Sequence, residues 1–176
     1  MDEAVKLAQF EQTILPHLNS GYNLARWLTR NEHDAEDVVQ EAYLRAYRFF
    51  DGFQGGDGRA WLLTVVRNTY LTWLRQKKGD VFMTNFDERA HSLGRDEPNP
   101  ESMLVRDSKL DALRECVESL PLEYREVLVM RELEEMSYKE ISDIASLPIG
   151  TVMSRLSRGR KRLLECMTAQ SKGATA

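Results

Sequence analysis

The residues best suited to chemistry lie near the C-terminal end of the chain. Five basic side chains fall within positions 155–162, and no acidic side chain lies among them. At helical spacing, Val152, Leu156 and Leu163 share an apolar face that would pack inward, with the small Gly159 between them, and another face is polar and cationic. Together with the neighbouring bases, this second face forms a candidate binding set: Thr151, Ser154, Arg155, Arg158, Arg160, Lys161 and Arg162.

This set of side chains suits double-stranded DNA. An α-helix fits the major groove, and arginine can make paired hydrogen bonds to the edge of guanine. Thr151 and Ser154 can contact phosphates or thymine methyl groups, and the later bases would mainly neutralise phosphates. The alternative is that these cations only stabilise the end of a helix and keep it soluble. That alternative explains one or two bases better than five in a chain whose formal net charge is −4.

A helix-turn-helix would position this cationic face. Ser137 and Glu140 have the spacing of a capping box, which predicts a helix over Tyr138–Ala145. A short turn follows at Ser146–Pro148, and the basic segment is predicted to continue as a helix to about Leu164. Two helices joined by a short turn have the shape of a helix-turn-helix.

A second set of side chains lies on a helix predicted over Arg59–Gln76. Aromatic rings, bases and amides share one side of it or follow directly: Trp61, Thr64, Arg67, Asn68, Thr72, Arg75 and Lys77. Such a mixture is typical of surfaces on which unpaired bases stack while cations hold the backbone. For Trp61, burial in the core is the competing interpretation. The glycine-rich segment Asp51–Gly58 before this helix is predicted to be a flexible loop.

A third set lies on a helix predicted over Ala35–Phe50, with Asp34 as the expected N-cap. Its predicted core stripe comprises Ala35, Val38, Val39, Ala42, Ala46, Phe49 and Phe50. The neighbouring surface has the mixed composition of a protein interface and comprises Asp37, Gln40, Glu41, Leu44, Tyr47 and Arg48. An ordinary solvated face with a Glu41–Arg45 pair is an equally good interpretation from spacing alone.

The periodicity of the whole chain predicts an all-α fold with two small helical domains. The N-terminal domain would cover residues 1–78, and residues 108–170 would form a second domain ending in the helix-turn-helix. Residues 79–107 have the composition of a flexible acidic linker, and residues 171–176 are expected to be a disordered tail. The remaining helices are predicted at Phe10–Leu18, Gly21–Leu28, Ser108–Ser119 and Leu122–Glu135.

The sequence lacks the motifs of enzymes, metalloproteins, disulfide-rich proteins and membrane proteins. The histidines are scattered, and HExxH, glycine-loop and nucleophile-elbow motifs are absent, so we expect no catalysis, no metal site and no cofactor. Cys116 and Cys166 stand far apart and outside any CxxC pair, so we expect reduced cysteines in a cytoplasmic protein. No apolar run is long enough for membrane insertion, and the N-terminus does not resemble a signal peptide.

Two blocks of the sequence resemble a known family. Similarity to sigma domain 2 is carried by DAEDVVQEAYLRAYRFF followed by GRAWLLTVVRNTYLTWLRQKK. Similarity to sigma domain 4 is carried by LPLEYREVLVMRELEEMSYKEISDIASLPIGTVMSRLSRGRKRLLE. Two such blocks in this order, joined only by a linker, resemble the extracytoplasmic-function (ECF) sigma factors, the smallest class of bacterial sigma factors.

The resemblance implies a transcription initiation factor that catalyses nothing itself. The surface set on Ala35–Phe50 would bind the clamp helices of the largest subunit of core RNA polymerase. The loop Asp51–Gly58 and the helix after it would recognise the promoter minus-10 element and hold its non-template strand open. The helix-turn-helix would read the minus-35 element in duplex DNA, and its domain would also contact the β flap. An anti-sigma factor is implied as a further partner.

Two other functions are compatible with a helix-turn-helix. An ordinary regulator would bind its operator without polymerase, usually as a dimer on a palindrome. A sigma-like decoy would only titrate an anti-sigma factor. The domain 2 block disfavours the ordinary regulator, and the basic helix at the C-terminal end disfavours the decoy.

Overall fold

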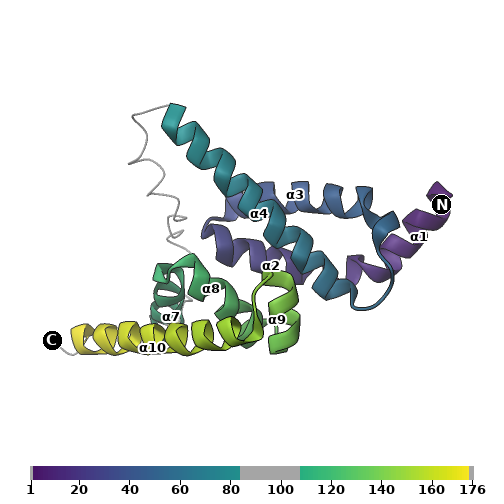
Figure 1. Cartoon of the computed structure of the whole chain (residues 1–176). Coiled ribbons are helices and arrows are strands. Elements are labelled where there is room, and N and C mark those ends of the chain that lie inside the picture. The colour runs from purple at the N-terminus through teal and green to yellow at the C-terminus, as the bar shows by residue number, and fades with distance from the viewer. Residues whose placement is uncertain (1, 84–107, 175–176) are drawn as a thin grey trace. The chain divides into compact units, whose positions relative to one another are not determined.

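The computed structural model describes residues 2–83 and 108–174, and every element within these ranges is helical (Figure 1). The predicted all-α class is therefore confirmed. The helices form two compact units: α1 to α4 make the first, and α7, α8, α10 and most of α9 make the second. Of the predicted linker, residues 84–107 lie outside the described residues, and residues 79–83 belong to the last helix of the first unit.

The first unit begins with α1 (Glu3–Thr13), the 3-10 turn η1 (Leu15–His17) and α2 (Leu18–Thr29). The sequence predicted one helix over Phe10–Leu18, which is wrong in two respects. α1 starts earlier, at a cap formed by Asp2, and it ends before Pro16. Proline cannot continue an α-helix, because it lacks the N–H and its ring clashes with the preceding turn.

The next helix, α3 (Glu32–Arg48), begins three residues before the predicted boundary. Its N-cap is Asn31, whose side-chain oxygen accepts a hydrogen bond from the N–H of Asp34 at 2.9 Å. The expectation that Asp34 caps this helix is therefore wrong. Asp34 lies in the first turn, where the positive end of the helix dipole favours an acidic residue.

The core stripe of α3 is buried as predicted except at Phe49. The helix ends at Arg48, and Phe49 leaves the helical conformation with φ −96° and ψ 7°. Because the backbone turns here, Phe50 enters the core at 4% exposure and Phe49 remains 61% exposed. The chain continues through the 3-10 turn η2 (Phe50–Gly52) and a loop to α4 (Gly58–Met83).

α2, α3 and α4 pack together around an apolar core. The core includes Leu24, Leu28, Val38, Ala42, Leu62, Leu63 and Val66, each at most 1% exposed. Gly21 lets α2 approach the other two helices, since a Cβ there would lie 3.1 Å from the Tyr43 hydroxyl and 3.4 Å from Val66 Cγ2. This packing fixes the direction of α4 relative to α3, and the candidate surfaces of both helices depend on it.

The second unit comprises α7 (Ser108–Ser119), α8 (Leu122–Leu128), the π-helical turn η3 (Val129–Leu133), α9 (Tyr138–Ala145) and α10 (Ile149–Ala174). The predicted capping box of α9 is confirmed. The N–H of Glu140 donates to Ser137 Oγ at 3.1 Å, and the N–H of Ser137 donates to Glu140 Oε1 at 3.3 Å. The bounds of α7 and α9 also match the prediction.

α10 packs on α8 through the face that was predicted to point inward, although Leu163 on this face is only half-buried. Val152 and Leu156 are at most 1% exposed. Gly159, three residues after Leu156, is also buried. A Cβ there would lie 3.0 Å from Leu128 Cδ1 and 3.2 Å from Tyr124 Cβ. The close approach of the two helices therefore requires glycine at position 159.

α10 is longer than predicted, because it continues to Ala174 instead of ending near Leu164. The expected disordered tail is therefore wrong for residues 171–174. Glu165, Met167 and Gln170 favour a helix. Gln170 Nε2 also donates to Glu115 Oε2 on α7 at 3.4 Å, which supports the added turns.

Cys116 and Cys166 form a disulfide, so the expectation of two reduced cysteines is wrong for this structure. The pair joins α7 to α10, and its Cα atoms lie 5.8 Å apart although 50 residues separate them. No local sequence pattern indicates this pairing, because it depends on how α7 packs against α10.

Candidate nucleic-acid and protein interfaces

The start of α10 is held at a fixed angle to α9 by a short turn. Ser146 adopts a left-handed conformation with φ +55°. The N–H of Leu147 donates to Ser142 O at 3.0 Å, and the Ser142 hydroxyl donates back to Leu147 O. The N–H of Thr151 donates to Pro148 O at 3.0 Å. These bonds connect the two helices in the arrangement that a helix-turn-helix requires.

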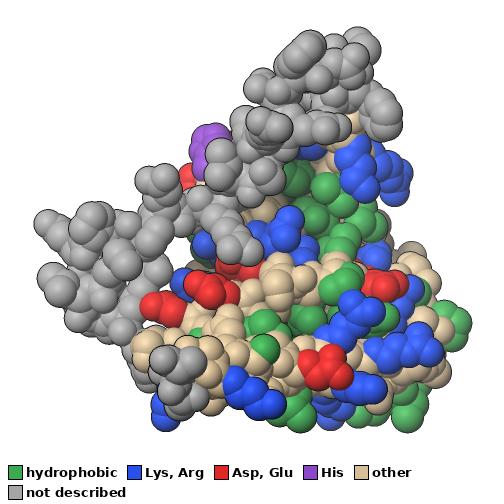
Figure 2. All heavy atoms as spheres, turned by 90° about the vertical axis from the view of Figure 1, so that its left-hand side faces the viewer, with side chains coloured by type: hydrophobic (Ala, Val, Ile, Leu, Met, Phe, Trp, Pro, Cys, Tyr) green, Lys and Arg blue, Asp and Glu red, His purple; other side chains and the backbone are tan. Residues whose placement is uncertain are grey.

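The cationic side chains of α10 differ in their surroundings. Arg158 and Lys161 are exposed and form no ion pair with any residue that the structure describes. Ser154 is also exposed, and Thr151 is half-buried at the first turn. In Figure 2, which faces the C-terminal end of α10, Lys and Arg side chains are scattered over the lower part of the view among hydrophobic and acidic ones. Thr151, Ser154, Arg158 and Lys161 are thus accessible to a polyanion.

The other arginines of α10 already have partners within the second unit. Arg160 Nη2 lies 2.8 Å from Glu132 Oε1, and this hydrogen bond raises the pKa of Arg160. Arg155 Nη2 lies 4.0 Å from Glu123 Oε2. The guanidinium of Arg162 lies over the ring of Tyr124, 4.9 Å from its centroid. These contacts orient the three side chains, and a phosphate would have to compete with the carboxylates for Arg155 and Arg160.

Two exposed apolar side chains near the start of α10 were missed by the sequence analysis. Ile149 is 42% exposed and Met153 is 51% exposed. They lie on the same helix as Ser154 and could contact thymine methyl groups in a major groove. Apolar side chains on a helix usually pack inward, so only their exposure distinguishes these two from core residues.

The predicted set on α4 divides in a similar way. Asn68 and Arg75 are exposed, and Thr64, Arg67 and Thr72 are half-buried. Lys77 Nζ lies 3.5 Å from Asp34 Oδ1 and 4.9 Å from the centroid of the Trp73 ring. Asn68 and Arg75 are therefore the most accessible members of the set, and Lys77 is held against the α3 side of the unit.

Trp61 lies half-buried in an aromatic cluster at the start of α4. Its ring centroid lies 5.4 Å from that of Phe53 and 6.2 Å from that of Phe50. Phe10 of α1 packs against Phe50 in a T-shaped arrangement at a centroid distance of 5.4 Å. The core interpretation of Trp61 accounts for these contacts, while its remaining exposed part is available to a ligand.

The loop before α4 is fixed at both ends. Lys6 of α1 is buried, and its Nζ lies 3.0 Å from Asp51 Oδ2. At the other end, Asp57 Oδ1 accepts hydrogen bonds from the N–H groups of Arg59 at 3.0 Å and Ala60 at 3.3 Å. A Cβ at Gly58 would lie 2.6 Å from Thr13 O, so α1 and this end of the loop are in close contact.

Between these fixed ends the loop is open. Gln54, Gly55 and Gly56 are exposed, and a Cβ at either glycine would meet nothing within 4 Å. Gly55 and Gly56 adopt φ +86° and +94°, a conformation that other residues rarely adopt. The expected flexible segment is thus a short exposed turn on a rigid base, which can present backbone groups to a ligand.

The predicted protein-binding surface on α3 is largely exposed. Asp37, Gln40, Glu41 and Arg48 are exposed, and Leu44 is 63% exposed, which is unusual for a leucine. The remaining member is Tyr47, which is half-buried. Its hydroxyl donates to Glu3 Oε1 at 2.6 Å, which raises the pKa of Tyr47, and its ring packs against Phe10.

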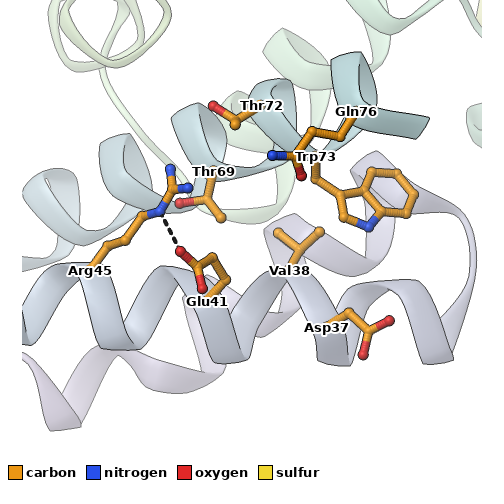
Figure 3. A pocket seen from close by; sticks show the side chains of 8 residues that line it. All are labelled: Asp37, Val38, Glu41, Arg45, Thr69, Thr72, Trp73 and Gln76. Atoms are coloured by element: carbon orange, nitrogen blue, oxygen red, sulfur yellow. Dashed lines mark hydrogen bonds and ion pairs between the residues drawn. The ribbon is translucent and has the colours of Figure 1, made fainter. Parts of the chain in front are cut away.

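A pocket of about 360 Å³ lies between α3 and α4 (Figure 3). Its lining comprises Asp37, Val38, Glu41, Arg45, Thr69, Thr72, Trp73 and Gln76. The predicted Glu41–Arg45 pair is confirmed, with Arg45 Nε donating to Glu41 Oε1 at 2.7 Å. The pocket adjoins the exposed α3 surface, so a partner that covers Asp37 could also place a side chain in it.

Within residues 2–83 and 108–174, no cluster of three or more His, Cys, Asp or Glu side chains could hold a metal ion. Among the described helices, none combines the length and the apolar character that a membrane span needs.

Comparisons with known proteins match both units. A model of sigma-70 region 2 matches residues 14–79, and a model of sigma-70 region 4 matches residues 110–163. The ECF RNA polymerase sigma factor SigE of Mycolicibacterium smegmatis is 33% identical over 166 residues, covering 94% of this chain and 64% of the relative. The ECF RNA polymerase sigma factor SigW of Bacillus subtilis is 32% identical over 149 residues, covering 81% of this chain and 80% of the relative.

A solved structure resembles the chain as well. The sigma factor RpoE of Bartonella quintana, crystallised with the anti-sigma factor NepR, matches with a TM-score of 0.77 and 27% identity over 91% of this chain and 97% of that one. A helical chain with region 2 followed by region 4 is a transcription initiation factor of the sigma type. The chain belongs to the sigma-70 family and, within it, to the ECF RNA polymerase sigma factors.

Proposed function

We propose that this chain binds core RNA polymerase, recognises the minus-35 and minus-10 promoter elements and promotes DNA opening. Residues 1–78 would bind polymerase and the minus-10 element, and residues 108–170 would bind the minus-35 element. The observation that carries the proposal is the exposed cationic face of α10 on a helix-turn-helix, in a chain that also holds region 2. Such a factor acts where its polymerase is, so we place it in the cytoplasm.

Polymerase binding is assigned to the α3 surface. Asp37, Glu41 and Leu44 combine exposed carboxylates with an exposed apolar side chain, which suits the clamp helices of the largest subunit. Duplex recognition is assigned to Thr151, Ser154, Arg158 and their neighbours on α10, and the β flap would contact the same unit. The opened non-template strand would contact the loop 54–56 and α4, where unpaired bases gain stacking and hydrogen bonds that offset the cost of opening.

An anti-sigma factor is proposed as a second protein partner. The Bartonella quintana relative was crystallised with one, and the α3 surface of this chain has exposed groups that such a partner could cover. A partner on this surface would compete with polymerase, so binding of the two should be mutually exclusive.

The test is in vitro transcription with bacterial core polymerase and a promoter library. Asp37→Ala should weaken binding to core polymerase by roughly tenfold, about 1.4 kcal/mol, because it removes a charge from the interface. The matched control is Glu36→Ala, which removes the same charge from a neighbouring exposed position of α3. Arg158→Ala should weaken promoter binding, and Arg114→Ala on α7 serves as its control.

The same assays separate this proposal from its alternatives. Sequence-specific DNA binding without any affinity for core polymerase would indicate an ordinary regulator. Binding to an anti-sigma factor without promoter-dependent transcripts would indicate a decoy. Either result would overturn the proposed function.

A further inference from the structure

Cys116 and Cys166 connect α7 to the helix that carries the candidate minus-35 contacts. Cys166 lies four residues after Arg162, one turn further along α10. We propose that this cysteine pair is a reversible redox-modification site, which controls how firmly α10 is held and therefore how well the unit binds promoter DNA. The effect on DNA rests on the proposed function, whereas the redox change of the cysteines does not.

The geometry allows a disulfide without any rearrangement of the backbone. The Cα atoms are 5.8 Å apart, within the range that disulfides require. Cys116 is fully buried and Cys166 is half-buried. Reduced cysteines also fit such positions, since a free cysteine behaves as a small apolar side chain. Both redox states are therefore compatible with the fold of the unit.

α7 buries few side chains in the unit. Within Ser108–Ser119, Cys116 and Glu118 are the buried residues, and Leu120 follows the helix end at 4% exposure. Leu110 and Leu113 remain 64% and 39% exposed, so the apolar side chains of the first turns contribute little burial. The other α7–α10 bond noted above, between Gln170 and Glu115, is exposed. The crosslink therefore adds a covalent attachment to a helix that buries few of its own side chains.

The less buried cysteine of the pair determines how the disulfide reacts. A thiolate of a low-molecular-weight thiol attacks the sulfur of Cys166, because Cys166 is half-buried and Cys116 is fully buried. A mixed disulfide forms at Cys166, the Cys116–Cys166 bond breaks, and the electron pair leaves on Cys116, which takes up a proton. A second thiolate attacks the sulfur of the bound thiol, releases the small disulfide and leaves Cys166 as a protonated thiol. Two electrons and two protons are transferred, and a small disulfide drives the reverse reaction.

In the cytoplasm, where we place this chain, such an exchange can regulate the protein. Disulfides in the cytoplasm are usually transient and serve catalysis or redox sensing, because thiol systems keep most cysteines reduced. A crosslink that closes a loop of 50 residues also restricts the unfolded chain strongly. We therefore expect oxidation to stabilise the unit and strengthen DNA binding. Reduction should release α7 and allow the last turns of α10 to fray.

The experiment uses the full chain in two states, treated with dithiothreitol or with oxidised glutathione under native conditions. Alkylation and mass measurement count the free thiols, and thermal unfolding compares the stability. Fluorescence anisotropy measures binding to a promoter duplex. We expect two thiols to appear on reduction, the Tm to fall by roughly 10 °C, and the DNA affinity to fall several-fold. All three changes should reverse on reoxidation.

The double variant Cys116→Ala/Cys166→Ala provides the control, because its Tm and DNA affinity should not respond to either treatment. If that variant does not fold, the comparison of the reduced and oxidised natural chain still tests the proposal. The proposal is overturned if the thiols exchange only in denaturant, or if both states melt at the same temperature. It is also overturned if both states bind DNA equally. If the thiol and Tm changes appear but the chain binds no promoter DNA in either state, even together with core polymerase, the proposed function is refuted instead.

Discussion

The ammonium nitrogen of Lys6 lies 3.0 Å from a carboxylate oxygen of Asp51, and this pair joins the first helix to the start of the loop before α4. The Lys6 side chain is buried and also lies over the Tyr47 ring, 5.0 Å from its centroid. With the Thr13–Gly58 contact, it makes α1 a support for the loop. The loop therefore presents Gln54–Gly56 from a fixed base.

Lys6→Met should loosen this support while retaining most of the apolar packing of the side chain. We expect a stability loss of about 1 kcal/mol, because Asp51 is half-exposed and can be rehydrated. We also expect weaker discrimination between bases at the minus-10 element, measured by transcription from promoters that differ there. Asp51→Asn should have a similar effect, and the double variant should add little to either. Unchanged base discrimination in both variants would restrict the pair to a structural role.

Gly159→Ala should destabilise the second unit by about 1–3 kcal/mol, because the added methyl group overpacks the α8–α10 contact. The nearest atoms would be Leu128 Cδ1 at 3.0 Å and Tyr124 Cβ at 3.2 Å. Gly150→Ala is the matched control on the same helix, since a Cβ there meets nothing within 4 Å. Urea unfolding should show the loss only at position 159, and equal effects at both positions would contradict the packing argument.

Glu132→Gln should strengthen DNA binding, because it removes the carboxylate that holds Arg160 at 2.8 Å. The released guanidinium can then neutralise a phosphate. The slope of log affinity against log salt concentration should therefore become steeper by about one. Anisotropy titrations at several salt concentrations measure this slope. Glu135→Gln removes the same charge from another exposed position and is the control. Equal gains in both variants would indicate a general charge effect rather than the release of Arg160.

Tyr43 should make stability sensitive to alkaline pH. Burial raises its pKa to about 12, against an ordinary value of 10.0, so the fold favours the neutral phenol. Because its pKa is raised in the folded state, neutral Tyr43 contributes to the free energy of unfolding. This contribution is complete below pH 10 and is lost as the pH rises toward 12. Urea unfolding at pH 9 and pH 11 should show this loss.

Tyr43→Phe tests the assignment, because it removes the titrating group. At neutral pH the variant should be about 1 kcal/mol less stable, because it lacks the hydrogen bond from the Tyr43 hydroxyl to Leu18 O. Its further loss of stability at alkaline pH should be smaller than that of the natural chain. An identical alkaline decline in both proteins would assign the effect to other groups.

Much of the fold follows from local sequence signals. Helical periodicity indicated an all-α chain, and the capping box Ser137–Glu140 located the start of α9. The inward face of α10 was also readable, because apolar and small residues recur at helical spacing. Such features depend on residues within one or two turns of each other, so the sequence alone suffices to predict them. Helix ends were less predictable, as Asn31 and Phe49 show, since several nearby residues can cap or end a helix.

The candidate sites depended more on tertiary structure. The cationic run of α10 was evident in the sequence, but its division into accessible Arg158 and paired Arg160 required the position of Glu132. The Lys6–Asp51 pair and the Cys116–Cys166 disulfide join residues that are 45 and 50 positions apart. No local pattern specifies such partners, because they meet only when the packing of apolar faces sets the distance and angle between helices. Local sequence therefore specifies the helices and the kind of surface they carry, whereas the packing between helices specifies which charges and thiols on them are paired.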